Sequence, residues 1–153
     1  MKIRKAKIED INELIKLFSE TITNYCSADY NEEQIKIWVS LGKEKQKWMD
    51  SINRHYFLVA VFDNQIVGFG SLKEDASIDL LYVHQNFLRQ GIASQLLCEL
   101  ETELERQHKT SISADVSITA KPFFEKHGFR VIKEQKNRIK NVEIINYKMI
   151  KEN

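Results

Sequence analysis

The sequence has few cysteines, no long apolar run and almost no net charge, and each shortage excludes a class of protein. Cys26 and Cys98 lie far apart and lack metal-ligand spacing, which excludes a disulfide framework. No apolar stretch is long enough to span a bilayer, and Met1 to Arg4 lead straight into patterned structure without a signal-peptide core. These features predict free thiols and a cytoplasmic protein.

The charges are balanced and the length suits one domain. Lys and Arg number 23 against 22 Asp and Glu, a net charge of +1. This balance gives no electrostatic reason to propose nucleic acid or a membrane as a partner. A chain of 153 residues can bury roughly 70% of its unfolded surface. We therefore expect residues 1–153 to form a single domain without an internal linker.

Hydrophobic periodicity predicts a mixed α/β fold. The crossover from residue 78 to residue 116 joins two strands through a helix, so this pair is expected to be parallel. Strands are expected at 2–6, 56–62, 65–72, 78–83, 111–116, 129–136 and 142–150, and helices at 8–22, 31–42, around 48–52, from 91 past 104, and from about 119 to 127. The whole pattern describes one central sheet with helices.

The segment from Leu80 to Leu97 is the most informative part of the chain. An apolar strand runs from residue 78 to 83, and an amphipathic helix begins near Gly91. Backbone N–H groups of the intervening loop and the positive end of the helix dipole together suit an anion such as phosphate. Gly91 lets a ligand approach the backbone, and Arg89 adds a positive charge. An ordinary strand–helix connection is the alternative.

Two motifs in this part of the chain resemble signatures of the GNAT superfamily of N-acetyltransferases. Tyr82 and Val83 resemble the strand end, and Gly91 and Ala93 resemble the small positions of the Q/R-x-x-G-x-G/A signature. Leu88 departs from its first position. The second signature, A-x-x-(F/L)-(Y/F)-x-x-x-G-F, is similar to Ala120, Phe123, Phe124, Gly128 and Phe129. The resemblance extends over nearly the whole chain.

The resemblance implies a fold, a cofactor and a site. The fold is a GNAT-like central sheet, mostly antiparallel, with a splayed parallel strand pair and helices on both faces. Acetyl-CoA is the cosubstrate, and no metal is implied. The residues expected to bind it are Leu81, Tyr82, Val83, Leu88, Arg89, Gln90, Gly91, Ile92, Ala93, Ser94, Ser117 and Phe124. Phe124 stands where the family often has a Tyr that protonates the leaving thiolate, and phenylalanine has no proton to give.

Candidate residues for the acceptor side are fewer. Asp79 is the general-base candidate, because a carboxylate within an apolar strand is costly unless it has a partner or a function. Asp79 alternates with Leu81 and Val83, so we expect it on the same sheet face as these residues. A structural carboxylate is the open alternative. Tyr25, Tyr30 and Trp38 lie in the segment that covers the acceptor site in the family, although core packing also explains the tryptophan.

The resemblance therefore predicts an acyltransferase. It moves an acetyl group from acetyl-CoA to a primary amine of a small molecule or peptide, by direct attack in a ternary complex. The alternative is a non-catalytic module that senses acyl-CoA, since Leu88 and Phe124 depart from the family pattern. The expected partners are a coenzyme A thioester and an amine acceptor. A homodimer that pairs the C-terminal strands is left open.

Overall fold

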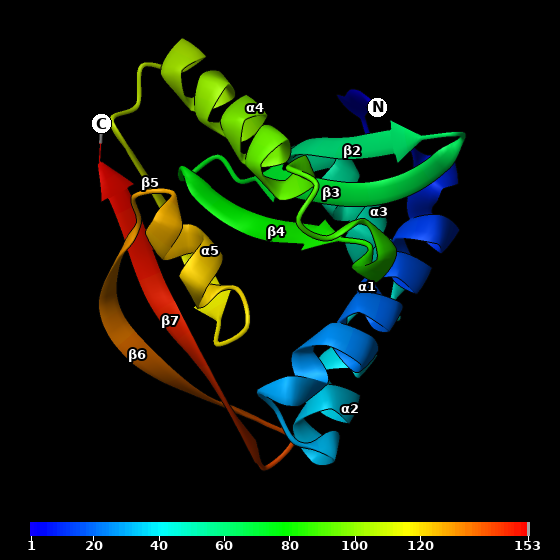
Figure 1. Ribbon diagram of the computed structural model, residues 1–153, viewed down its shortest axis with the longest axis vertical. Coiled ribbons are helices and arrows are strands. Elements are labelled where there is room, and N and C mark those ends of the chain that lie inside the picture. Colours follow the sequence, from blue (N-terminus) through cyan, green and yellow to red (C-terminus); the bar gives the residue numbers. More distant parts are fainter. Residues whose placement is uncertain (153) are drawn as a thin grey trace.

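A single mixed sheet of seven strands organises the computed structural model, which describes residues 1–152. Its strand order is β1-β2-β3-β4-β5-β7-β6 (Figure 1). The strands are β1 (Lys2–Lys5), β2 (Tyr56–Phe62), β3 (Gln65–Leu72), β4 (Ser77–Val83), β5 (Ser111–Ser117), β6 (Arg130–Ile139) and β7 (Val142–Glu152). The helices are α1 (Ile11–Tyr25), α2 (Glu32–Ser40), α3 (Lys45–Arg54), α4 (Ile92–Arg106) and α5 (Lys121–Lys126), with short 3-10 turns η1 (Ile8–Asp10), η2 (Cys26–Ala28) and η3 (Gln85–Phe87).

The sheet is splayed between β4 and β5. Every other neighbouring pair is antiparallel, whereas β4 and β5 run parallel and pair only at Ser77 with Ser113 and at Ile78 with Ala114. Beyond Ile78 the two strands diverge, and Figure 1 shows α5 beside the resulting gap. The predicted fold class, with its splayed parallel pair, is confirmed.

Helices cover both faces of the sheet and define two apolar cores. Helix α4 lies over β3 and buries Leu96, Leu97, Leu100 and Leu104 completely. Each buried leucine contributes about 1.5–3 kcal/mol relative to exposure. A side chain at Gly68 would lie 3.1 Å from Ile92, so glycine there lets α4 approach the strand closely. The second core, on the opposite face, packs α1, α2 and α3 with residues such as Leu14, Phe18 and Trp48.

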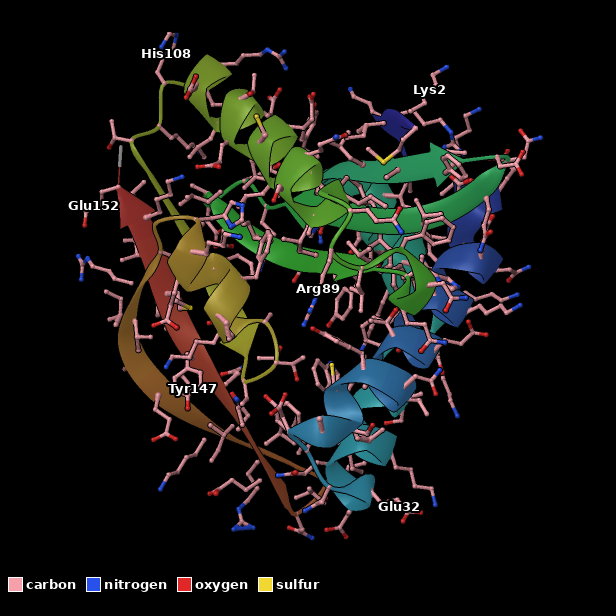
Figure 2. All side chains as sticks on the ribbon, viewed as in Figure 1. Lys2, Glu32, Arg89, His108, Tyr147 and Glu152 are labelled. Atoms are coloured by element: carbon pink, nitrogen blue, oxygen red, sulfur yellow. The ribbon has the colours of Figure 1, made fainter. Side chains whose placement is uncertain are left out.

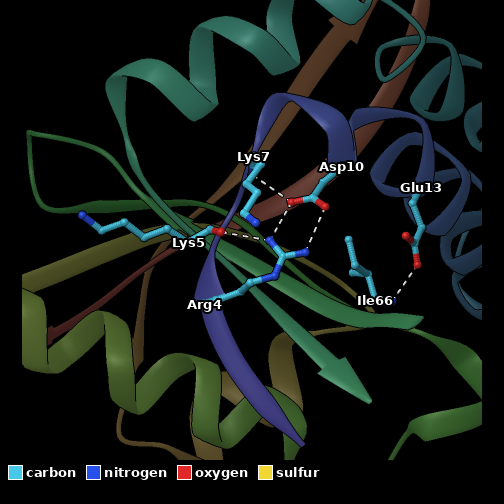
Figure 3. A network of polar contacts seen from close by, with 6 residues as sticks. All are labelled: Arg4, Lys5, Lys7, Asp10, Glu13 and Ile66. Carbon is cyan, nitrogen blue, oxygen red and sulfur yellow. Dashed lines mark hydrogen bonds and ion pairs between the residues drawn. The ribbon is translucent and has the colours of Figure 1, made fainter. Parts of the chain in front are cut away.

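A polar network anchors the N-terminal strand to the helices (Figure 3). The Arg4 guanidinium donates two hydrogen bonds, of 2.8 and 3.0 Å, to the Asp10 carboxylate, which also accepts from the Lys7 N–H at 2.8 Å. Glu13 of α1 accepts from the Ile66 N–H of β3 at 2.6 Å. Burial opposes ionisation of Asp10, but the bonds from Arg4 and Lys7 outweigh it and lower its pKa. The network therefore favours the charged carboxylate.

Within the part of the chain that the structure describes, no helix has the length and apolar character needed to cross a membrane.

Candidate active site

A continuous cleft of about 1380 Å³ passes through the splay. The loop before α4 lines one end, and Figure 2 shows Arg89 beside the gap between the two parts of the sheet. Side chains of α1, α2, α3, β6 and β7 line the other end. We call these the cofactor end and the acceptor end. The diverging backbones of β4 and β5 lie between them, so a ligand in the cleft can reach a strand edge that has lost its neighbour.

Free backbone donors form the cofactor end. The first intrahelical hydrogen bond of α4 is donated by Gln95 to the Gly91 carbonyl, at 3.0 Å, so the N–H groups of Ile92, Ala93 and Ser94 precede the helical ladder. Gly91 has φ +81°, and a side chain added to it would meet no protein atom within 4 Å. The backbone is thus accessible at this point. Orphan N–H groups and the helix dipole here fit the diphosphate of a nucleotide cofactor.

Two neighbouring side chains of this loop have different surroundings, one in the apolar core and one in the cleft. Leu88, which departs from the family signature, packs against the apolar core under α4. Arg89 has φ +62°, an unusual conformation for a residue with a side chain, and it lines the cleft. Its guanidinium is the loop's positive charge. Gln90 is exposed and lines a separate small hollow with Ile92 and Gln95.

Asp79 is the extra residue of a β-bulge in β4. Ser71 of β3 pairs with Leu80, and the next residue, Leu72, pairs with Ile78, which leaves Asp79 without a partner residue. The bulge interrupts the alternation, so the argument that placed Asp79 with Leu81 and Val83 is wrong. Ile78, Leu81 and Val83 face one core, whereas Leu80 and Tyr82 face the other.

The expected apolar setting for this carboxylate is also wrong. Asp79 is exposed and lines the cleft where β4 leaves β5. An extra residue in one strand re-aims a side chain, and bulges are frequent beside active sites for that reason. The position is compatible with a base that meets a solvated acceptor.

A second carboxylate, Asp115, faces the same opening and was missed by the sequence analysis. It follows Ala114, the last residue of β5 that pairs with β4, just as Asp79 follows Ile78. Gln135 of β6 donates to its carboxylate at 3.0 Å and to the Asn146 side chain at 2.9 Å.

This network continues across the last two strands. Asn137 of β6 also donates to the Asn146 side-chain oxygen, at 3.0 Å. Asp115, Asn137 and Asn146 all line the cleft. These residues belong to three strands, so only the cross-strand register brings them together. The acceptor end therefore has a polar wall on β5, β7 and β6.

The predicted acceptor residues have different roles in the structure. Tyr25 is exposed and Trp38 half-buried, and both line the cleft. The Tyr30 hydroxyl donates to the Ile145 carbonyl at 2.6 Å and accepts from the Ile118 N–H at 2.9 Å. Burial raises the pKa of Tyr30 to about 12. This hydroxyl ties the helical segment to β7 and to the turn after β5.

Several backbone and side-chain groups near the splay have structural partners. Thr21 of α1 donates to the Val83 carbonyl at 3.3 Å. Tyr82 stacks on Phe69, with ring centroids 5.5 Å apart, and burial raises the pKa of its hydroxyl. Ser117 accepts from the Ala120 N–H at 3.0 Å, so this hydroxyl shapes the turn into α5. All three residues from Leu81 to Val83 still line the cleft through other atoms.

Phe124 lines the cleft from the side of α5. The ring is 4% exposed and packs edge-on against Phe129, with centroids 5.0 Å apart. Three histidines outside the predicted site lie at or near the cleft, and His55 and His127 line it. His84 accepts from the Asn86 N–H at 3.1 Å and so caps η3, whereas His55 lines the acceptor end.

The splayed sheet and the strand–loop–helix with free N–H groups are features of a coenzyme A-type acyltransferase fold. A family model of the acetyltransferase (GNAT) domain matches residues 26–151. The chain belongs to the GNAT acetyltransferase family.

Particular relatives share nearly its whole length. It is 32% identical over 149 residues to the uncharacterized N-acetyltransferase YafP of Escherichia coli, covering 97% of this chain and 94% of that protein. A GCN5-related N-acetyltransferase structure from Rhodopseudomonas palustris superposes with a TM-score of 0.95 at 27% identity, covering 99% and 95% of the two chains. The PaiA N-acetyltransferase from Thermoplasma acidophilum, solved in complex with coenzyme A, gives a TM-score of 0.82 at 25% identity, with 99% and 98% covered.

Proposed function

We propose that residues 1–153 act as one N-acetyltransferase domain that transfers an acetyl group from acetyl-CoA to a primary amine of a small molecule or peptide. The observation that carries this proposal is the continuity of the cleft. One opening through the splay joins the free N–H groups before α4 to the polar wall of β5, β7 and β6. A donor and an acceptor can therefore occupy the two ends together and react directly.

The residues at the cofactor end fit coenzyme A. The N–H groups of the loop from Leu88 to Ser94 would hold the diphosphate, and Arg89 would contribute its charge. The edge of β4 from Leu81 to Val83 has no neighbouring strand and suits an extended pantetheine arm, as in β-strand addition. When bound, acetyl-CoA supplies an activated thioester carbonyl. The chain's part is to orient this carbonyl and to accept the proton of the amine.

Asp79 is the proposed proton acceptor for the amine. An amine attacks only when neutral, so a base must take its proton, directly or through water. Asp79 lies at the position where both ends of the cleft meet. Asp115, with its amide network, lines the same cleft and would orient the acceptor through hydrogen bonds. Tyr25 and Trp38 complete the acceptor pocket in this proposal.

The chemistry of the cysteines supports direct transfer over an acetyl-cysteine intermediate. Cys26 lines the cleft, and burial raises the pKa of its thiol to about 11. A thiol with that pKa stays protonated near neutral pH and is a poor nucleophile. Cys98 is exposed on α4 and is not among the residues that line the cleft. Attack by the acceptor amine itself is thus the simpler route. Water would protonate the leaving thiolate, because Phe124 has no proton to give.

An amine-panel assay tests the proposal. The protein is incubated with acetyl-CoA and single primary amines or peptides, and the release of free thiol is measured. Thiol release that depends on the amine supports an acetyltransferase. Tight coenzyme A binding with no release for any amine would favour the acyl-CoA sensor instead. A cytoplasmic location and a homodimer stay predictions.

A further inference from the structure

Two side chains meet beside the diphosphate loop, and one of them has no place in the site as described so far. Ser94 is the third residue of α4, and His127 follows α5. The Ser94 hydroxyl oxygen and the His127 Nε2 are 2.9 Å apart. Both residues line the cleft. The contact therefore links the helix that binds the diphosphate to the helix that carries Phe124.

The other ring nitrogen determines how this contact is protonated. His127 Nδ1 lies 2.9 Å from the Phe123 carbonyl oxygen. A carbonyl only accepts hydrogen bonds, so Nδ1 must carry a proton. In the neutral ring Nε2 then has a lone pair and accepts the Ser94 hydroxyl proton. The imidazole also packs on the Phe123 ring, with centroids 4.2 Å apart, which fixes its orientation.

This arrangement suits the free protein but not an anion. Because the Ser94 hydroxyl donates its hydrogen bond to a neutral His127, only the lone pairs of its oxygen face the cleft. They lie next to N–H groups that attract negative charge. Protonation of Nε2 by solvent reverses the bond, because the imidazolium then donates to the Ser94 oxygen. The Ser94 proton becomes free for a phosphate oxygen, and the ring adds a positive charge.

We propose that His127 is a positioning residue for the coenzyme A diphosphate. When the diphosphate binds, His127 takes up a proton and thereby turns the Ser94 hydroxyl into a hydrogen-bond donor. The inference rests on the proposed binding of coenzyme A but not on turnover. Cationic side chains also lie in this part of the molecule. Arg89 of the loop and Lys126 of α5 line the same cleft, and Lys151 of β7 lies near Gly128 and pairs with Glu101 at 2.7 Å. In this proposal the diphosphate supplies the negative charge that the imidazolium meets.

Calorimetry counts the protons. The probe is 3′-dephospho-coenzyme A, which keeps the diphosphate but lacks the phosphate that itself titrates near neutral pH. Titrations at pH 7 in two buffers of different ionisation enthalpy give the number of protons taken up. For the wild-type protein we expect uptake of up to one proton, and an affinity that falls by up to about tenfold per pH unit above the titration.

A matched pair of variants isolates the histidine. His127→Gln keeps a polar contact to Ser94 without a titratable ring, so its affinity should be flat with pH and its proton uptake reduced. His108→Gln changes an exposed histidine at the opposite end of α4, as Figure 2 shows, and should behave as wild type. Equal uptake by wild type and His127→Gln would overturn the inference.

Nitrogen-15 spectra of the histidine rings test the same point without any variant. They should show His127 as the Nδ1–H tautomer in the free protein at pH 7 and as an imidazolium in the complex. A neutral ring in the complex would contradict the inference. No binding of the probe to any form of the protein would contradict the proposed function itself.

Discussion

The two ends of the cleft are built in different ways. The cofactor end is one continuous piece of backbone, from Leu88 to Ser94, whose donors are available because a helix starts there. The acceptor end is assembled from side chains of three helices and of strands β5, β6 and β7. A backbone site tolerates changes in most side chains but depends on local conformation, whereas a side-chain site depends on each residue and on the register between strands. Single substitutions should therefore affect the two ends differently.

The largest effect is expected at Asp79, where a substitution should change turnover without changing coenzyme A binding. Asp79→Asn keeps the shape and removes the base, so turnover should fall by roughly 100- to 10,000-fold, the usual contribution of a general base. Coenzyme A affinity should change little, and the loss should shrink at high pH, where more of the amine is already neutral. Steady-state kinetics over a pH series measure both effects.

Asp115→Asn is the matched control for this experiment. It removes a second carboxylate from the same opening while leaving an acceptor for Gln135. The acceptor KM should rise more than turnover falls. Full activity of Asp79→Asn near neutral pH would make that carboxylate structural, and water or His55 would become the next candidate for the base.

A substitution of Gly91 is expected to weaken the binding of coenzyme A. A residue with a side chain at φ +81° costs about 1–2 kcal/mol, and a carboxylate beside the diphosphate adds repulsion of about 1–4 kcal/mol. Gly91→Glu should thus abolish the thermal stabilisation by coenzyme A. Asparagine tolerates the left-handed backbone, so Gly91→Asn should keep part of the thermal stabilisation by coenzyme A. If coenzyme A stabilises Gly91→Glu as much as the wild type, the diphosphate does not bind at this loop.

Tyr30 tests whether a predicted acceptor residue acts through structure. Tyr30→Phe keeps the ring, whose centroid lies 5.2 Å from that of Trp38. It leaves the Ile118 N–H and the Ile145 carbonyl without their hydrogen-bond partner. The expected loss of unfolding free energy is about 1–3 kcal/mol. Tyr25→Phe is the control, because that side chain is 43% exposed and should be neutral. Equal stabilities of the two variants would refute the role of the Tyr30 hydroxyl.

Asp10 offers a comparison with a region away from the cleft. Removing its charge in Asp10→Asn should cost about 1.5–3 kcal/mol at pH 7 without changing activity per folded molecule. The pKa of Asp10 is lowered in the folded state, so its stabilisation is present above the unfolded pKa of about 3.9 and is lost as the pH falls through the folded value. Melting temperatures of wild type and variant should therefore converge in acid. A constant difference would contradict the assignment.

The smallest effect is expected at Phe124. The ring lines the cleft but is mostly buried, so Phe124→Tyr adds one hydroxyl that can face the opening. Activity should be kept or raised, because the new hydroxyl offers a proton to the leaving thiolate. Thiol release at saturating amine measures this. A destabilised variant with unchanged turnover would show that the ring serves only the core.

The sequence predicted the individual strands and the start of α4 better than the pairing between strands, for a physical reason. Strands β2 and β3 were predicted with their observed bounds, and the start of α4 was predicted from Gly91, because periodicity and a glycine are local signals. The bulge at Asp79 was not predicted, since it exists only in the pairing of β3 with β4. Asp115 was missed for the same reason. Its partner Gln135 is twenty residues away, and only the order β5-β7-β6 brings the two together.

The short parallel pairing has a consequence for how the molecule moves. β4 and β5 share two paired positions, whereas β5 and β7 share seven. The sheet should therefore open along the β4–β5 boundary before it opens elsewhere, with β5, β6 and β7 protected as a unit against amide hydrogen exchange. A ligand that bridges the boundary would bond to both sides and slow this opening. The proposed site of chemistry thus coincides with the boundary where the sheet has its fewest paired positions, and we expect occupancy of the cleft to make the sheet more rigid.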